Sequence, residues 1–190
     1  MATFSIKIDQ GDLNRVRNML DGIKKAPDKV FVRALNKTLT GVKTDASAKV
    51  REDLNVTKKA VDATIKIQRA STKNMTAALH STGKPLPLIA FTGTRQTKKG
   101  VSVLVKKRTP RSVIPGTFIR TMPKTGHKGV FWRAKSGGRI APRLPISERF
   151  GPRVPDILSN EPVMKDVLQK ADARLHKNID HELKYELSKL

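Results

Sequence analysis

Residues 28–54, DKVFVRALNKTLTGVKTDASAKVREDL, carry the most regular apolar pattern in the chain. The apolar side chains recur every three or four positions over about seven turns: Phe31, Ala34, Leu35, Leu39, Val42, Ala46, Val50 and Leu54. This spacing predicts one long amphipathic helix over about 28–53, with a single stripe that must be buried. Pro27 suits the first turn of such a helix. Gly41 lies inside it and is unfavourable for a helix interior.

A second amphipathic helix is predicted over about 161–188, with Asn160 or Ser159 as its cap. Its apolar positions form two neighbouring series: Val163, Val167, Ala171 and Ile179, and Met164, Leu168, Leu175, Leu183 and Leu187. We expect this helix to pack on the first helix or on a neighbouring subunit. The shared core is expected to place Leu35, Val42 and Ala46 against the sheet or against Leu168 and Leu175.

Short segments with alternating apolar residues predict strands. They lie at residues 3–8, 65–67, 75–80, 86–91, 101–105, 117–122 and 130–132. Short helices are expected after Asp12 and Thr57, each acting as an N-cap. The turn-rich basic stretches 92–100 and 106–116 indicate protruding loops, and 133–145 a flexible connector.

These elements predict an α+β fold: a small antiparallel sheet with long basic loops, packed on a long helix in the N-terminal half and on a C-terminal helix. We expect residues 1–150 to form one α+β domain with basic loops. Residues 151–190 would supply a Pro-rich turn and the second helix, either in the same domain or as an arm that packs between subunits.

The charge of the chain is strongly basic and unevenly distributed. There are 39 Lys and Arg against 16 Asp and Glu, a formal net charge of +23. Residues 61–150 hold 19 of the basic residues but only two acids, Asp62 and Glu148. Such a concentration is typical of a protein with a polyanionic partner, although a solvated surface is the simpler alternative.

The same composition argues against catalysis. Acid–base pairs and hard-metal sites need clustered carboxylates, which residues 61–150 hardly supply. The chain has no cysteine, so disulfides and thiolate zinc sites are excluded. His176 and His181 are five positions apart, which is not the spacing of a helical metal pair. We therefore expect no enzyme activity, catalytic residue, metal or cofactor.

No apolar run is long enough to cross a membrane, and residues 1–7 do not resemble a signal peptide. We therefore expect synthesis and folding in a cytoplasm, without a membrane partner.

Clusters of basic residues remain as the candidate functional positions. On a hairpin, the cations that flank residues 101–105 would gather at the two ends of one strand, and a second group follows on a Gly-rich segment. The candidate DNA- or partner-facing residues are Lys98, Lys99, Lys106, Lys107, Arg108, Arg111, Arg133, Lys135, Arg139 and Arg143. Few aromatic residues lie among them, which favours contact with the backbone of duplex nucleic acid over base stacking.

Four stretches of the chain, in this order, resemble the prophage minor tail protein Z family. They are Arg33–Thr38 (RALNKT), Ile114–Met122 (IPGTFIRTM), Gly126–Arg133 (GHKGVFWR) and Arg143–Pro155 (RLPISERFGPRVP), followed by the terminal helix. The resemblance implies a structural component at the head-proximal end of a phage tail. Such a protein completes the tail or occupies the head–tail joint through which DNA passes. The resemblance implies no catalytic residues.

The expected function is therefore a minor tail or tail-completion protein, a homo-oligomeric ring subunit around the DNA path. Its expected partners are other tail or neck proteins, with possible non-specific contact with duplex DNA. The expected location is the virion, after assembly in the host cytoplasm. The alternative is a free, non-specific nucleic-acid-binding protein in the host cytoplasm. Such a protein would bind duplex as a monomer or dimer, whereas a ring component would oligomerise or co-purify with tails.

Overall fold

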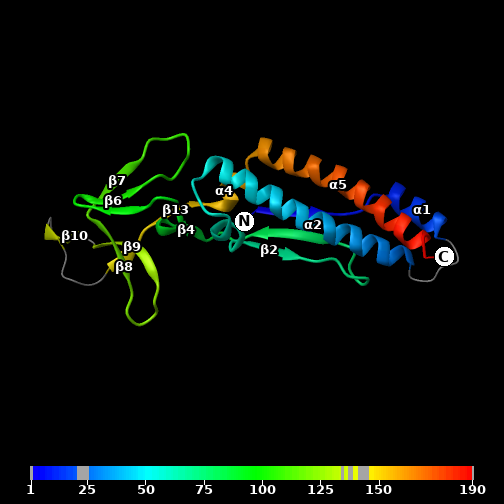
Figure 1. The fold of residues 1–190 in the computed structure, drawn as a ribbon, viewed down its shortest axis with the longest axis horizontal. Helices are drawn as coiled ribbons and strands as arrows, with labels where there is room; N and C mark the ends of the chain where they lie inside the picture. The colour runs from blue at the N-terminus through cyan, green and yellow to red at the C-terminus, as the bar shows by residue number, and fades with distance from the viewer. Residues whose placement is uncertain (1, 21–25, 134, 137–138, 141–145, 190) are drawn as a thin grey trace. The chain divides into compact units, whose positions relative to one another are not determined.

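The computed structural model describes residues 2–20, 26–133, 135–136, 139–140 and 146–189 (Figure 1). The chain divides into two compact units, each drawn from separate stretches of sequence. Unit 1 comprises Met1–Ser47, Ile65–Thr82 and Pro155–Leu190, and unit 2 comprises Ala48–Thr64 and Gly83–Val154. Both contain helices and small antiparallel sheets, so the predicted α+β class is confirmed. The predicted boundary at residue 150, with residues 151–190 in the same domain or as a packing arm, stays a prediction.

Helices form one layer of unit 1. They are α1 (Gln10–Met19), α2 (Ala26–Asp53), most of which lies in this unit, α4 (Val154–Leu158) and α5 (Glu161–Leu187). The two long helices that the apolar spacing predicts are thus confirmed. The cap of α1 is Asp9, whose carboxylate accepts a hydrogen bond of 2.6 Å from the backbone N–H of Asp12. The prediction of Asp12 as the cap was wrong, because the cap and the start of the helix lie three residues earlier.

The core of unit 1 lies where α2 faces α5, which runs alongside it (Figure 1). Leu35, Val42 and Ala46 are each at most 1% exposed, as predicted. The buried stripe of α5 is regular, with one residue every four positions: Val167, Ala171, Leu175, Ile179 and Leu183. The prediction that Leu168 shares the core was wrong, since it is 42% exposed. The buried stripe combines members of both predicted series, Val167, Ala171 and Ile179 from the first and Leu175 and Leu183 from the second, and it leaves Leu168 outside.

A three-stranded antiparallel sheet completes unit 1, in the order β1-β3-β2. Its strands are β1 (Ala2–Ile6), β2 (Ile65–Gln68) and β3 (Ala77–Ser81). In register, Leu79 of the central strand lies opposite both Phe4 and Ile67. Leu79 is fully buried and Phe4 is 3% exposed, so one face of the sheet contributes to the core.

Unit 2 is built mainly from short strands. One sheet has the order β5-β6-β7 and another β12-β9-β8, and two further pairs are β13-β4 and β10-β11. The first sheet consists of β5 (Arg95–Thr97), β6 (Gly100–Val103) and β7 (Ser112–Pro115). The second consists of β8 (Thr117–Thr121), β9 (Lys128–Arg133) and β12 (Ile146–Glu148). The pairs are β4 (Pro85–Pro87) with β13 (Phe150–Arg153), and β10 (Lys135–Ser136) with β11 (Arg139–Ile140).

Three sequence-based predictions need correction in unit 2. Stretches 92–100 and 106–116 are not simply loops, because they contain the two strands β5 and β7 that flank β6. All four residues of β6 are buried, and a strand buried on both sides needs a partner on each edge. Within 86–91, residues Leu88–Ala90 form a 3-10 turn instead of a continuous strand. Of the predicted connector 133–145, the described residues include the β10-β11 pair.

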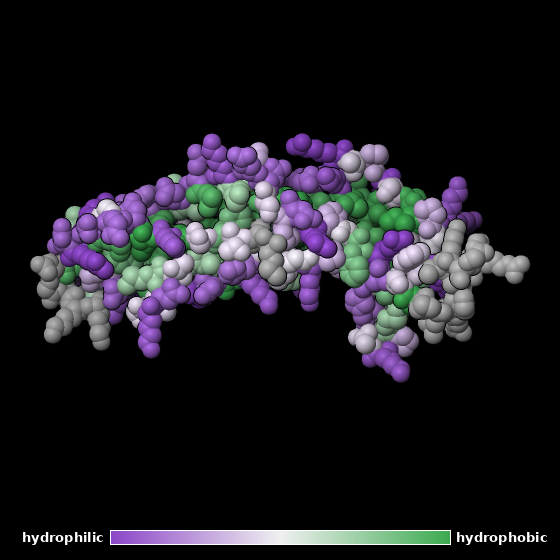
Figure 2. All heavy atoms as spheres, turned by 180° about the vertical axis from the view of Figure 1, so that it is seen from behind, coloured by the Kyte–Doolittle hydropathy of each residue, from purple (hydrophilic) through white to green (hydrophobic). Residues whose placement is uncertain are grey.

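A short helix, α3 (Lys58–Asp62), lies in unit 2, and Thr57 caps it as predicted by accepting a hydrogen bond from Ala60 N. Hydrophilic side chains project from both units on the face shown in Figure 2. No helix in the described parts of the chain is long and apolar enough to cross a membrane.

Candidate functional site

Six of the predicted cations surround the β5-β6-β7 sheet, and we call them the loop cations: Lys98, Lys99, Lys106, Lys107, Arg108 and Arg111. Lys98 and Lys99 occupy the turn between β5 and β6. The other four lie in the connection between β6 and β7. The two groups therefore lie at opposite ends of β6, as the sequence predicts for a strand flanked by turns. All six residues are exposed.

The β6–β7 connection is held by its backbone, which leaves the side chains of Lys106, Lys107 and Arg108 unpaired among the described residues. Lys107 N donates to the carbonyl of Asp53 at 2.9 Å, and Asn55 N donates to the carbonyl of Val105 at 2.9 Å. Within the described residues, the side chains of the loop cations make no hydrogen bond or ion pair except at Arg111. A fixed backbone carrying unpaired cations is suited to binding an external anion without rearrangement.

Arg111 is held in place by the turn that precedes β5. Its Nη1 donates to the carbonyl of Gly93 at 2.6 Å. Gly93 has φ +75°, and a Cβ there would lie 2.8 Å from Arg111 Nη2. The glycine therefore supplies both the backbone conformation and the space for the guanidinium.

The second predicted group of cations is only partly described. Arg133 lies at the end of β9, with its Cζ 5.0 Å from the ring centroid of Phe118. Lys135 and Arg139 lie on the paired strands β10 and β11, where Ser136 is opposite Arg139. Arg143 lies outside the described residues. The structure thus brings the backbones of Lys135 and Arg139 onto neighbouring strands.

Sequence reasoning missed a stacked arginine in unit 2. Arg149 is exposed, and its Cζ lies 4.1 Å from the ring centroid of Trp132. It was missed because it is an isolated cation, whereas the predicted positions were chosen from clusters.

The single acidic residue between Asp62 and Asp156 is already paired. Glu148 accepts from, or ion-pairs with, His127 Nε2, which lies 3.0 Å from both carboxylate oxygens. Within the described residues, no group of three or more His, Cys, Asp or Glu has an arrangement that fits a metal ion. The described surface of unit 2 therefore offers little negative charge to its own cations.

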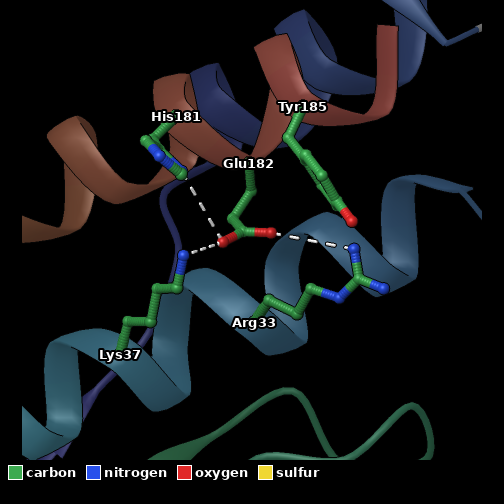
Figure 3. A pocket seen from close by; sticks show the side chains of 5 residues that line it. All are labelled: Arg33, Lys37, His181, Glu182 and Tyr185. Carbon is green, nitrogen blue, oxygen red and sulfur yellow. Dashed lines mark hydrogen bonds and ion pairs between the residues drawn. The ribbon is translucent and has the colours of Figure 1, made fainter. Parts of the chain in front are cut away.

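A cluster of polar residues lines a pocket of about 310 Å³ between α2 and α5 in unit 1 (Figure 3). Its lining residues are Arg33, Lys37, His181, Glu182 and Tyr185. The Glu182 side chain is only 4% exposed and ion-pairs with Lys37, while Arg33 Nη1 lies 3.8 Å from its second oxygen. Because its cations are internally neutralised, this pocket serves to hold α5 on α2.

The cluster is part of a polar row along the two helices. Arg33 Nη1 also donates to Glu186 at 2.6 Å, and Asn178 donates to the hydroxyl of Thr38 at 2.9 Å. On the other side of α2, Asn36 bonds both the N–H and the carbonyl of Ala70. The Arg33–Thr38 stretch therefore ties α2 to α5 and to the segment after β2, which gives it a structural role.

We predict that Gly41 is required by the last contact of this row. Arg174 crosses Gly41 to reach Asp45, with Nη1 at 2.7 Å from the carboxylate, and a Cβ at position 41 would lie 2.6 Å from Arg174 Cδ. Gly41→Ala should therefore gain helix propensity but displace Arg174. In an Arg174→Ala background the same change should stabilise the protein by about 1 kcal/mol, since only the propensity gain remains.

Urea unfolding of the four proteins of this cycle measures the coupling. An equal gain from Gly41→Ala in both backgrounds would contradict the assigned role of the glycine.

The chain was compared with known proteins. The family model described as prophage minor tail protein Z (GPZ) matches residues 10–190. Neither the curated proteins nor the solved structures gave a significant match.

Proposed function

The chain belongs to the prophage minor tail protein Z family, and from this premise we propose that it is a tail-completion subunit forming a ring around the DNA path. Members of this family are structural proteins of phage tails and not enzymes, with other tail proteins as partners and the virion tail as their location. The ring, its head-proximal position and the contact of unit 2 with DNA are the proposal.

The observation that carries the proposal is the charge of unit 2. Its sequence stretches hold 21 Lys and Arg against 4 Asp and Glu, a formal net charge of +17. Ion pairs in the described part of this unit include Lys49–Glu52 and His127–Glu148. Most cations of unit 2 are therefore left to external anions, and DNA is the polyanion that a phage tail conducts.

The surface of unit 2 fits a nucleic-acid backbone better than the centre of a protein interface. Protein interfaces concentrate aromatic and apolar side chains at their centre and are depleted in lysine. In the described part of unit 2, the exposed large hydrophobic residues are Val113 and Phe150, on strands of two different pairings. Four of the six loop cations are lysines, which are suited to sequence-independent phosphate contact.

Neutralising the loop cations to glutamine tests the proposal. We expect nearly unchanged thermal unfolding, because exposed charges contribute little to stability. We expect particles that still assemble but hold or deliver DNA poorly. A matched control replaces four lysines and two arginines of unit 1 that are exposed: Lys66, Lys73, Lys165, Lys177, Arg17 and Arg69. The control particles should retain DNA normally.

Two other outcomes would reject the proposal of a ring subunit in contact with DNA. If rings or tails no longer form, the loop cations contact acidic faces of neighbouring proteins. If the isolated protein binds duplex tightly, with steep salt dependence and no assembly at any concentration, it is a free nucleic-acid-binding protein. This second candidate function rests on the same charge, and electron microscopy of the purified protein or the virion distinguishes it by the presence of a ring.

A further inference from the structure

We infer that Arg149, stacked on Trp132, is a preoriented binding position for a backbone phosphate of DNA, separate from the loop cations. The inference rests on the proposed function, because it takes unit 2 as the DNA-facing part of the protein. It adds a named contact at the β8-β9-β12 sheet by a residue that belongs to neither of the basic groups predicted from the sequence.

The backbone of Arg149 is held in place by two hydrogen bonds. Its N–H donates to the carbonyl of Val130 at 2.8 Å, and its own carbonyl accepts from Leu88 N at 3.3 Å. Its guanidinium lies 4.1 Å from the centroid of the indole ring, at the distance of a cation–π contact. Both ends of the side chain are thus restrained, so binding an anion there loses little side-chain entropy.

The guanidinium has no anionic partner of its own. Its side chain makes no hydrogen bond or ion pair with any residue that the structure describes. The adjacent carboxylate, Glu148, pairs with Phe131 in register, and Phe131 is on the opposite face of β9 from Trp132. Glu148 is engaged there by His127. The stacked guanidinium therefore keeps its edge N–H groups available, which is the geometry that binds phosphate bidentately.

Neighbouring residues on the same face carry hydrogen-bond donors. Ser147 lies opposite Trp132 in register, and Thr121 lies opposite Lys128 at the other end of β9. Ser147, Thr121 and Lys128 are all exposed. Alternation along β9 places Lys128 on the face of Trp132. Ser147 supplies an exposed hydroxyl opposite Trp132, whereas Lys128 lies four residues along β9 with the buried Val130 between them. Donors spaced along the strand suit an extended phosphate backbone better than a single free anion.

Trp132 makes this position directly observable, since it is the one tryptophan of the chain. A short blunt duplex is titrated into the full-length protein at about 50 to 200 mM salt, the range in which phosphate contacts change affinity most. Duplex anisotropy gives the affinity and its salt slope, and Trp132 fluorescence reports on the stack. We expect the fluorescence to change in parallel with binding.

Three variants separate a specific contact from bulk charge. Arg149→Gln should abolish the fluorescence change and lower the log–log salt slope by about one unit. Arg149→Lys should keep most of the slope but lose the fluorescence change, because lysine retains the charge without the planar stack. Arg69→Gln removes an exposed arginine of unit 1 and should leave both readouts as in the wild type.

Each other outcome overturns the inference. If duplex binds but the fluorescence and the slope do not depend on Arg149, the inference fails and the proposed function stands on the loop cations. If Arg149→Gln and Arg69→Gln change the salt slope and the fluorescence equally, the duplex responds to the total charge of the protein and not to a contact at Arg149. If polyglutamate of equal charge gives the same fluorescence change at the same salt, the position binds a protein carboxylate. If duplex binds under none of these conditions, nor in assembled particles, the DNA contact of the proposed function fails as well.

Discussion

Replacing Leu35 with alanine is expected to lower the free energy of unfolding by about 2–5 kcal/mol. Leu35 is fully buried in the apolar stripe of α2. Removing its side chain loses the transfer free energy of the apolar atoms and leaves a cavity that a packed core fills only in part. Urea unfolding followed by circular dichroism measures the change.

Leu168 provides a matched control on α5. It is the same residue type in the partner helix, but it is 42% exposed. Leu168→Ala should therefore change the stability by less than about 0.5 kcal/mol, because alanine is also the best helix former. Equal losses at the two positions, or a loss below about 0.5 kcal/mol at Leu35, would show that the buried faces of the helices are misassigned.

Removing the two cations that pair with Glu182 is expected to lower the free energy of unfolding more than removing the charge of Glu182 itself. The Glu182 side chain is 4% exposed, whereas those of Arg33 and Lys37 are 42% and 51% exposed. Changing Arg33 and Lys37 together to methionine leaves a buried carboxylate with His181 at 3.8 Å as its remaining ion-pair neighbour. Leaving a buried charge uncompensated typically costs about 3–5 kcal/mol.

Glu182→Gln tests the opposite case. The two cations remain hydrated at their exposed ends, and Arg33 keeps its 2.6 Å bond to Glu186. Glu182→Gln should therefore lower the free energy of unfolding by on the order of 1 kcal/mol. Thermal and urea unfolding at neutral pH measure both variants, with a double Lys66→Met and Arg69→Met change as the exposed control. A larger loss from Glu182→Gln than from the double cation variant would refute the assigned burial asymmetry.

The long helices were predictable because their apolar spacing persists over many turns. The stripe of α2 follows directly from Leu35, Val42 and Ala46, all of which are buried. The buried stripe of α5 cannot be read from the sequence in the same way, because Leu168 and Val167 belong to adjacent apolar series of similar hydrophobicity. In the structure Val167 is fully buried and Leu168 is 42% exposed, and this choice depends on packing against neighbouring elements instead of on the local sequence.

The small strands of unit 2 were less predictable, because their pairing stabilises them more than their own composition does. β5 consists of Arg95, Gln96 and Thr97, which have no apolar alternation. It forms because Gln96 bonds the backbone of Ile119 and because β6 needs a partner on that edge. Such edge strands resemble loops in a sequence.

The candidate site was predictable as a region and only partly as residues. Runs of lysine and arginine identified the loop cations, since a cluster is visible in sequence without any knowledge of pairing. Arg149 was not identified, because its position over Trp132 depends on the register of β9 with β12. Tertiary pairing of this kind has no local sequence signal.

The interleaved division of the chain has a consequence for its synthesis. Unit 2 ends at Val154, whereas unit 1 resumes at Pro155 and includes α5. Chains fold from the N-terminus as they leave the ribosome, so α2 emerges long before the helix that covers it. Until α5 is translated, the apolar stripe around Leu35 stays open to chaperones and proteases. Chains truncated before α5 (Glu161–Leu187) are therefore expected to leave this stripe uncovered and to be cleared faster than the full-length chain, which pulse-chase labelling measures.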